Sequence, residues 1–245
     1  MKNFEKILFK FISNNQDAIG YLNAAQSSFF EDVLNQHKLN SIEDIKSRFE
    51  DQFEMFYQCL LEYYCCNLYP HPDMEVFWNV LDEMQKSHKF SKTDTNFLNA
   101  LKNSSVSLYK VSYNSQNNKV ILDNIIEQEI LEIDQSNIEQ SYIGHTIYAR
   151  PIKIQNKRII LAEGQFVFPE EIVEDTVTYL LKIYEHMVNH YNKMPEVEFY
   201  RHTKLSSRED INILLKKVWC KDLLTEYMLY LIEPKEGIIK PIVIH

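Results

Sequence analysis

Cysteine and histidine, two residue types that bind metals, lie close together in the stretch YYCCNLYPHPDMEVFW, residues 63–78. Structural zinc sites usually take cysteines from a Cys-x-x-Cys pair, and Cys65, Cys66 and His71 lack that spacing. Cys59 and Cys66 are seven residues apart. On a helix this is about 10.5 Å, more than the roughly 7 Å that a disulfide spans. We therefore expect packing, with metal binding or redox chemistry as the alternative.

The helix predicted around these cysteines is apolar on nearly all sides. Phe56, Cys59, Tyr63 and Cys66 share one stripe at helical spacing. The rest of the surface is covered by Phe53, Tyr57, Leu60, Leu61, Tyr64 and Leu68. A helix with this pattern lies at the centre of a core, where free cysteine behaves as a small hydrophobic residue. We expect Cys59 and Cys66 to be buried, reduced and free of metal.

A second pair of metal-binding side chains, His186 and His190, has the i, i+4 spacing that places two imidazoles on one helix face, as in zinc-binding helices. The residue after His186 is Met187, so the general-base Glu of an HExxH motif is absent. A third ligand could come from His202 or a carboxylate, but nothing in the sequence selects one. We expect no bound metal and no cofactor, and a metal-dependent enzyme using His186 and His190 stays an alternative.

The helix that carries these histidines has two apolar stripes. The first stripe consists of Val173, Val177, Leu180, Tyr184, Met187 and Tyr191. The second consists of Ile172, Tyr179, Ile183, His186 and His190. A helix with two stripes is usually packed between two layers. We therefore expect the second stripe to flank a packing or partner interface.

A third candidate is the basic hairpin ARPIKIQNKR. Its charged and aromatic residues are Tyr148, Arg150, Lys153, Lys157 and Arg158. Single-stranded nucleic acid is commonly held this way, because bases stack on rings while cations meet phosphates. However, Lys and Arg on edge strands also prevent edge-to-edge pairing, and hairpin tips are solvated. Nucleic-acid binding is therefore an alternative prediction.

The elements that must position these residues fall into three regions. Helical periodicity predicts helices over residues 3–13, 17–36, 42–68, 74–88 and 92–103. Ser41 and Ser91 each precede an Asp by three residues, which is the spacing of a helix-capping pair. Pro70 and Pro72 are expected to end the third helix.

Near Ser107 the period changes from 3.6 to 2. Strands are predicted at residues 109–113, 119–122, 129–134, 145–154, 158–163 and 164–168. Pro151 marks an edge or a bend in the strand 145–154. Pro169 then starts a helix that runs to about Asn192, and residues 193–205 form an extended connector. A last long helix begins at the capping pair Ser206 and Glu209, and residues 237–245 form an apolar extended tail.

The fold class predicted is α+β. A helical region, residues 1–104, leads into a small antiparallel β barrel or curved sheet, residues 105–168. Two long C-terminal helices, within residues 169–245, cover it. Two arrangements stay open, three separate domains or one packed unit, and the absence of a Pro/Gly/Ser-rich linker favours the single unit.

Composition excludes several classes of enzyme. The chain has 245 residues, 45% of them hydrophobic, but only four glycines. No GxGxxG, GxxxxGK[ST] or GxSxG motif is present, so P-loop, Rossmann and α/β-hydrolase functions are disfavoured. The formal charge of −9 disfavours non-specific binding to nucleic acid.

The sequence also argues against a membrane location. The first residues, MKNFEKILFKFISNNQ, form an amphipathic pattern interrupted by charges, unlike a secretory signal. The most apolar stretch, residues 214–232, contains five charged residues, which disfavours a place within a bilayer. We expect a cytoplasmic protein that does not contact a membrane, with non-classical secretion as an effector left open.

The segment 119–152 resembles a small β segment of uncharacterised bacterial proteins. The shared elements are Asp123, Ile125, Gly144, Ala149 and Arg150. The Gly that usually follows the acidic strand is Glu127 or Gln128 here. The resemblance implies a small β module and no activity.

The function predicted is that of a non-enzymatic binding or scaffold protein, acting on another protein through its surface. A homo-oligomer stays open. The two alternatives are a nucleic-acid-binding barrel using residues 150–158 and a metal-dependent enzyme.

Overall fold

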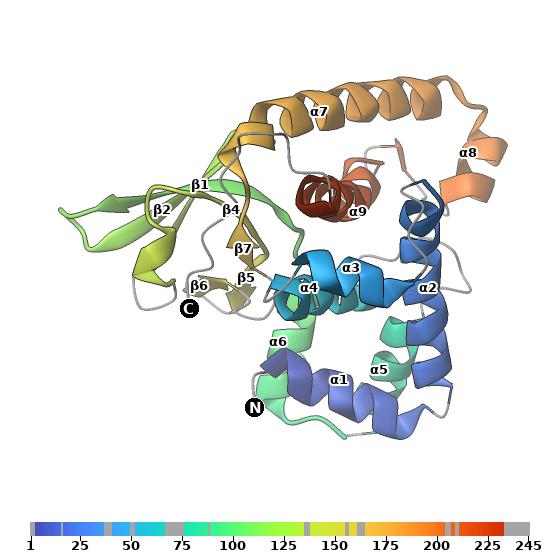
Figure 1. Cartoon of the computed structure of the whole chain (residues 1–245). Coiled ribbons are helices and arrows are strands. Elements are labelled where there is room, and N and C mark those ends of the chain that lie inside the picture. The colour runs from blue at the N-terminus through green and yellow to red at the C-terminus, as the bar shows by residue number, and fades with distance from the viewer. Residues whose placement is uncertain are drawn as a thin grey trace.

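The structure of the chain is a computed structural model (Figure 1). It describes residues 3–15, 17–36, 41–49, 52–66, 76–87, 89–134, 138–154, 157–160, 165–203, 207–208 and 211–232. Over these residues it confirms the α+β class, with a helical N-terminal region followed by an antiparallel sheet and further helices.

The N-terminal region consists of α1 (Asn3–Asn14), α2 (Ala18–Gln36), α3 (Ile42–Phe49), α4 (Phe53–Cys66), α5 (Val76–Lys86) and α6 (Lys92–Lys102). The predicted capping pairs are confirmed. The Ser91 hydroxyl accepts from the Asp94 N–H at 3.2 Å, and the Asp94 carboxylate accepts from the Ser91 N–H at 3.2 Å. Ser41 and Asp44 make the same two hydrogen bonds. Pro70 and Pro72 lie outside the described residues.

The prediction of one helix over residues 42–68 is wrong, because α3 ends at Phe49 and α4 begins at Phe53. In a continuous helix Phe49 and Phe56 would be separated by about two turns, roughly 10.5 Å. In the structure their ring centroids are 4.9 Å apart. The break therefore lets Phe49 fold back onto α4, and burial of this ring outweighs the local helical pattern.

The main sheet has the strand order β3-β2-β1-β4-β7, and its neighbours are antiparallel. Its strands are β1 (Ser107–Asn114), β2 (Lys119–Asn124), β3 (Glu129–Asp134), β4 (Thr146–Ala149) and β7 (Phe166–Val167). A second, two-stranded sheet pairs β5 (Pro151–Ile154) with β6 (Lys157–Ile160). Cα atoms of β6 come within 8 Å of β3, but the described strands do not hydrogen-bond into a closed barrel. The curved-sheet form of the prediction therefore holds.

The strand predicted over residues 145–154, with an edge or bend at Pro151, is divided at Arg150, so the bend is confirmed but the single strand is not. Arg150 is completely buried, and its side chain is held by Glu62 of α4. The next residue, Pro151, has no N–H for the ladder of the first sheet. The chain therefore leaves the first sheet at Arg150 and enters the second.

The main core lies between the helical region and one end of the sheet. It is crossed by α9 (Ile211–Ile232), which contacts α3 and α4 (Figure 1). Phe166 joins the sheet to this helix. Its ring lies 4.7 Å from the Tyr148 ring and 4.1 Å from the Tyr227 ring. A separate cluster, including Val111, Leu122 and Leu131, covers one face of the sheet.

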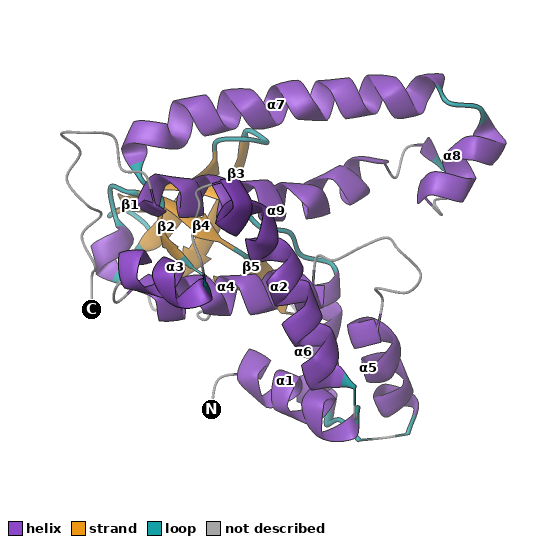
Figure 2. Cartoon of the chain, turned by 45° about the vertical axis from the view of Figure 1, so that its right-hand side comes forward, coloured by secondary structure: helices purple, strands orange, loops and turns teal. Residues whose placement is uncertain are grey.

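The C-terminal helices form an arm along one side of the molecule. The arm consists of α7 (Glu170–Lys193) and α8 (Glu196–Thr203), which pack on α9, and α7 is the outermost helix in two different views (Figures 1 and 2). The first turn of α7 meets the sheet, where Glu170 accepts hydrogen bonds from the Thr146 N–H at 2.9 Å and from Lys110 Nζ at 2.7 Å. The rest of α7 extends away from the sheet.

The predicted extended connector at residues 193–205 is wrong, because residues 196–203 form α8. Glu196 and Glu198 complement the positive end of this helix. Phe199 is buried against Ile211 and Leu215 of α9. The predicted start of the last helix, Ser206 with Glu209, and the tail at residues 237–245 lie outside the described residues. No helix in the described ranges combines the length and the apolar character needed to cross a membrane.

Candidate functional site

Two of the five residues predicted to bind nucleic acid are buried. Arg150 and Tyr148 have 0% and 1% of their surface exposed. Lys153 is exposed, whereas the side chains of Lys157 and Arg158 lie outside the described residues. A buried guanidinium cannot reach a phosphate, so the prediction is wrong for Arg150 and Tyr148.

Arg150 instead makes an ion pair inside the core. Its Nε donates to Oε1 of Glu62, a buried residue of α4, and Nη1 donates to the Ser104 carbonyl oxygen at 3.2 Å. Burial by itself would lower the pKa of Arg150, but the Glu62 carboxylate more than offsets this effect and raises the pKa. Arg150 is therefore a permanent positive charge that joins α4, the end of α6 and the junction between the two sheets.

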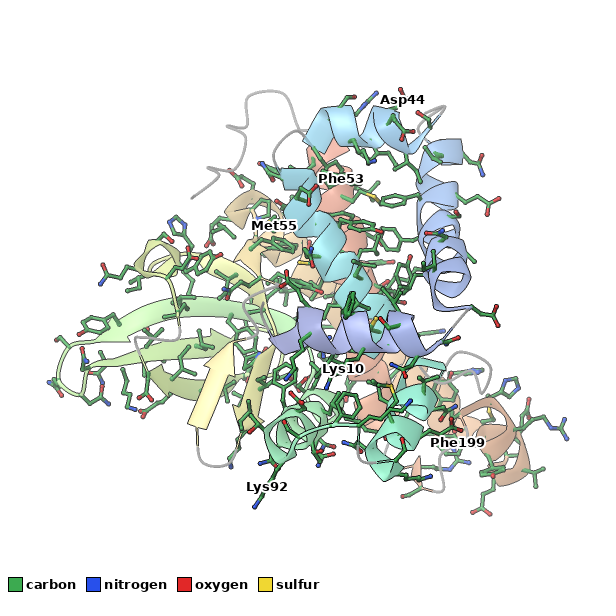
Figure 3. The ribbon with its side chains drawn as sticks, turned by 90° about the horizontal axis from the view of Figure 1, so that it is seen from below. Lys10, Asp44, Phe53, Met55, Lys92 and Phe199 are labelled. Atoms are coloured by element: carbon green, nitrogen blue, oxygen red, sulfur yellow. The ribbon has the colours of Figure 1, made fainter. Side chains whose placement is uncertain are left out.

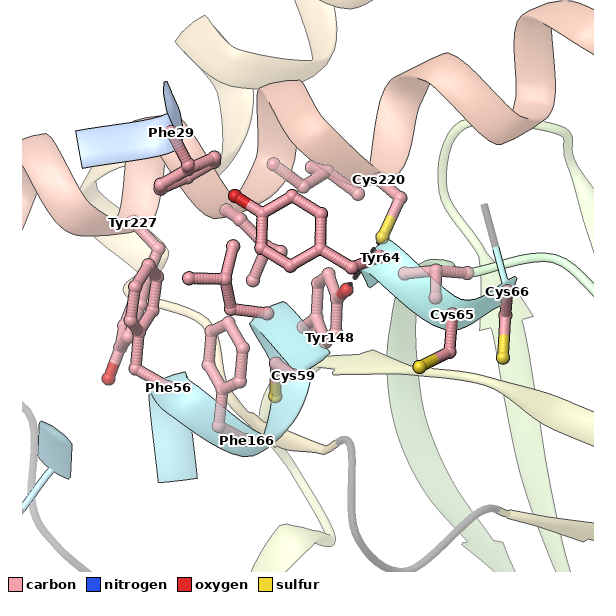
Figure 4. Close-up of a cluster of buried hydrophobic side chains, with 14 of the residues drawn as sticks. Phe29, Phe56, Cys59, Tyr64, Cys65, Cys66, Tyr148, Phe166, Cys220 and Tyr227 are labelled. Carbon is pink, nitrogen blue, oxygen red and sulfur yellow. Dashed lines mark hydrogen bonds between the residues drawn. The ribbon is translucent and has the colours of Figure 1, made fainter. Parts of the chain in front are cut away.

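The four cysteines are buried and are not joined in disulfides, which confirms that part of the prediction (Figure 4). Burial and the nearby Glu62 raise the pKa of Cys59 well above its usual value, and burial raises the pKa of Cys220 to about 12. The Cys220 sulfur lies 2.9 Å from the Tyr148 hydroxyl. Nucleophilic chemistry needs the thiolate, so these environments keep the thiols unreactive.

The first stripe of α7 packs inward, because Val173, Val177, Tyr184 and Met187 contact the buried clusters. The second stripe lies on the flank of the helix. His186 and His190 are exposed, and Tyr179 has 48% of its surface exposed. The expectation that α7 lies between two layers is wrong for the described chain. The reason is that α9 covers only one side of α7, as Figure 2 shows.

Among the described residues, no group of three or more His, Cys, Asp and Glu side chains could hold a metal ion. His186 and His190 remain two side chains on one exposed helix face. Their role at a partner interface stays a prediction.

A groove of about 640 Å³ lies where α6 meets both sheets. Figure 3 shows α6, which begins at Lys92, beside the second sheet. One wall is the face of α6 that carries Asn96 and Asn99, continued by the C-cap residue Asn103. The opposite wall is the strand β5, with Pro151, Ile152 and Lys153. The remaining lining residues are Ala100, Ser104, Ser105, Tyr109, Glu127, Glu129 and Leu131.

The turn that carries Glu127 is fixed by a buried asparagine. The Asn124 Oδ1 accepts hydrogen bonds from the N–H groups of Ile126 and Glu127, each at 3.1 Å. Its Nδ2 donates to the Glu127 carboxylate at 2.9 Å. Gln128, one of the two positions where the resemblance leads us to expect Gly, has φ of +57°. This is the left-handed region that Gly adopts most easily. The acidic end of the groove is therefore held in place by the backbone.

The buried ion pair also supports the groove. Ser104 lines the groove, and its carbonyl oxygen accepts from Arg150. Arg150 immediately precedes Pro151, the first residue of the opposite wall. The buried Arg150 side chain therefore fixes the distance between the α6 wall and the β5 wall of the groove.

Sequence reasoning missed this groove. The local signal was the set Asn96, Asn99 and Asn103, because spacings of three and four residues place three amides on one face of a helix. The opposite wall comes from a strand about fifty residues later, and no local pattern connects the two.

The model of a family of unknown function, DUF7986, matches residues 78–216. Since this is more than half of the chain, the protein belongs to that family. The matched residues include α6, both sheets and α7, and therefore all the residues that line the groove. They also include the segment 119–152, but the match does not describe the predicted bacterial β segment. No curated protein matches the chain, and no solved structure matches it.

Proposed function

We propose that this member of the DUF7986 family is a non-catalytic binding protein that holds an extended peptide segment of a partner protein in the groove between α6 and β5. The observation that carries the proposal is the pairing of a wall bearing three amides, formed by α6 and its C-cap residue, with the open side of a strand. The two walls offer complementary ways to hold a peptide backbone.

The strand wall offers backbone pairing. Among the described strands, β5 is hydrogen-bonded only to β6. In an antiparallel pair, alternate residues direct their N–H and C=O groups away from the partner strand. An extended peptide can therefore add to β5, as peptides add to sheet edges in many recognition domains. Pro151 lacks a donor, and consecutive residues face opposite edges of the strand, so only one of Ile152 and Lys153 would pair with the peptide.

The helix wall offers side-chain pairing. Each Asn amide presents both a donor and an acceptor, which matches the C=O and N–H of a peptide unit. Asn99 is exposed, and Asn96 is half-buried. The apolar side chains of Leu131 and Ile152 also line the groove. We expect the bound segment to place one apolar side chain against them.

The charges of the groove indicate the direction of the peptide. Glu127 and Glu129 belong to the β2–β3 hairpin, and Lys153 belongs to the strand wall. A peptide with a basic residue at one end and an acidic residue at the other would complement both. Complementary charge favours one partner over others more than it raises affinity.

Binding is favoured over catalysis by the types of residue that line the groove. They include neither Cys nor His. The thiols of the described chain are buried and their pKa values are raised where a shift is resolved. Amide and hydroxyl groups are suited to holding a polar ligand in position.

The test is selection of peptides from a random library displayed on phage, followed by titration of synthetic peptides by calorimetry. We expect enriched sequences that bind the wild-type protein and bind Asn99→Arg at least about tenfold more weakly, because the larger side chain fills the groove. The matched control is Thr93→Arg, which adds the same side chain to an exposed position of α6 outside the groove. Peptides that bind all three proteins equally, or no enriched peptide, would contradict the proposal.

A further inference from the structure

We infer that the exposed flank of α7 is a self-association surface, through which two copies of the chain pair with their α7 helices antiparallel. This inference is independent of the groove, which lies at the opposite side of the sheet junction. It concerns Ile172, Tyr179, Ile183, His186 and His190, the second stripe of the helix, here called the α7 flank.

The first argument is exposure on a rigid helix. Tyr179 on the flank is 48% exposed, and His186 and His190 are also exposed. Ile172, at the beginning of the flank, packs partly against the main core, and Ile183 is half-buried, so the exposed part of the flank runs from Tyr179 to His190. Apolar surface on a fixed support is more typical of an interface than scattered single hydrophobic residues are.

Rigidity comes from both ends of the helix. At the N-terminal end, Glu170 is bound by the Thr146 N–H and Lys110. At the C-terminal end, Arg208 donates to the carbonyl oxygens of Tyr191 and Met194. The same guanidinium lies 4.7 Å from the centre of the Phe199 ring. In the middle, the Tyr184 ring packs against Trp219 of α9 with centroids 5.4 Å apart.

The second argument is the distribution of charge along α7, which identifies the partner. The first six residues contain four acids, Glu170, Glu171, Glu174 and Asp175. The last twelve residues contain Lys182, His186, His190 and Lys193, with Glu185 as the one acid. A helix with an acidic beginning and a basic end is complementary to an antiparallel copy of itself.

The residues beside the α7 flank are also acidic near its beginning and basic near its end. At 100° per residue, Asp175 borders the flank near its beginning and Lys193 borders it near its end, while Glu171 lies about 60° from the edge of the flank, further round the helix towards solvent. A twofold axis near Ile183 would bring Asp175 to the partner's His190, and Glu171 to the partner's Lys193. Tyr179 would then contact the partner's His186. Such a contact is isologous, because both copies use the same surface.

The size of the contact sets the expected strength. A helix of 24 residues is about 36 Å long. One pair of helices of this length buries less than the roughly 800 Å² per partner of a typical stable interface. We therefore expect a weak dimer with a dissociation constant of roughly 10–30 µM, which salt weakens further.

The test is sedimentation equilibrium of three proteins at low ionic strength. The first is the wild type, the second is Glu171→Lys/Asp175→Lys, and the third is His190→Glu/Lys193→Glu. All four positions are exposed. In the first double variant the lysine introduced at position 171 faces the partner's Lys193, and in the second the two introduced glutamates face the partner's Asp175 and the partner's Glu171. We therefore expect self-association to weaken at least about tenfold in each. An equimolar mixture of the two variants restores opposite charges at both ends, so we expect it to form a heterodimer as strong as the wild-type dimer.

The control is Lys86→Glu/Lys92→Glu, on exposed positions of α5 and α6 at the end of the molecule away from α7 (Figure 2). It should dimerise as the wild type does. A wild type that stays monomeric at several hundred micromolar, roughly ten times the upper range expected, would overturn the inference. So would variants that dimerise normally, or a mixture of two monomeric variants that fails to associate. Circular dichroism checks that each variant is folded.

Discussion

The helices α4 and α7 look alike in the sequence, since both are apolar on more than one side, but they occupy opposite environments. Half of the residues of α4 are buried, including Phe56, Cys59 and Glu62. Among the described side chains of α7, which is much longer, only Thr176 and Leu180 are buried. The helix α4 therefore lies at the centre of the core, whereas α7 lies on the outside of the molecule.

Charge content explains the difference better than the apolar stripes do. In α4 two residues of fourteen are charged, Glu54 and Glu62. In α7 seven of twenty-four are charged, and its two histidines are exposed as well. Each buried charge needs a partner to offset its lost hydration, so a helix with many charges must keep most of its surface in water. Two apolar stripes therefore predict a central helix only where charges are few.

The comparison predicts the largest effect at the single buried charge of α4. Glu62→Ala would leave Arg150 buried without its carboxylate, and we expect a loss of about 3–5 kcal/mol in the free energy of unfolding. The matched change in α7, Glu174→Ala, removes an exposed glutamate and should cost no more than about 0.5 kcal/mol. Urea denaturation measures both.

A double variant separates the charge from the packing. Glu62→Leu with Arg150→Met replaces the ion pair by apolar side chains, and it should recover most of the loss seen in Glu62→Ala. If Glu62→Ala costs no more than Glu174→Ala, the ion pair is not buried as described and the contrast between the helices fails.

Thiol reactivity gives the second largest contrast. Cys59 is completely buried, and burial together with Glu62 raises its pKa, so the thiol is both inaccessible and protonated at pH 8. We expect labelling at least about 1000-fold slower than for a cysteine introduced by Thr178→Cys on the exposed side of α7. Cys66, at the end of α4, should be the fastest of the native four. Rapid labelling of Cys59 in folded protein would place α4 at the surface.

Arg208→Ala should affect the arm and leave α4 unchanged. It removes hydrogen bonds to two carbonyl oxygens and the contact with the Phe199 ring, which together contribute about 2 kcal/mol. Hydrogen exchange should become faster in α8 and in the last turns of α7, with no change in α4. Arg208→Lys, which keeps the charge but not the two-pronged geometry, should lose part of the protection. A uniform increase over the whole chain would mean that the arm does not open separately.

The parts of the fold that could be predicted depend on local signals. The caps at Ser41 and Ser91 were predictable because the three-residue spacing to Asp is itself the interaction. The first three strands were predictable because alternation directly produces one buried face, seen in Val120 and Leu122. Each of these features is decided within a few residues.

The parts that could not be predicted depend on partners far away in the sequence. Arg150 lies in a basic hairpin and was expected to be exposed, but its carboxylate partner is 88 residues earlier. The same distant contact interrupts the predicted strand 145–154. The groove is another such case, since Asn99 and Ile152 meet only after both sheets have folded. In both cases the sequence shows which residue types are present, but it does not show which residues contact each other in the fold.

The smallest effect is expected at the two histidines of α7. His186→Gln/His190→Gln should change the free energy of unfolding by no more than about 0.5 kcal/mol, because both side chains are exposed and Gln is a good helix former. Elemental analysis should find the same metal content before and after the change, because a zinc site normally needs three or more protein ligands. In the antiparallel dimer both histidines lie in the interface, so self-association should weaken modestly while stability does not change. Stoichiometric zinc in the wild type that is lost in the double variant would instead make this face a metal site. The exposed face of α7 would then have a role different from the one that its charges indicate.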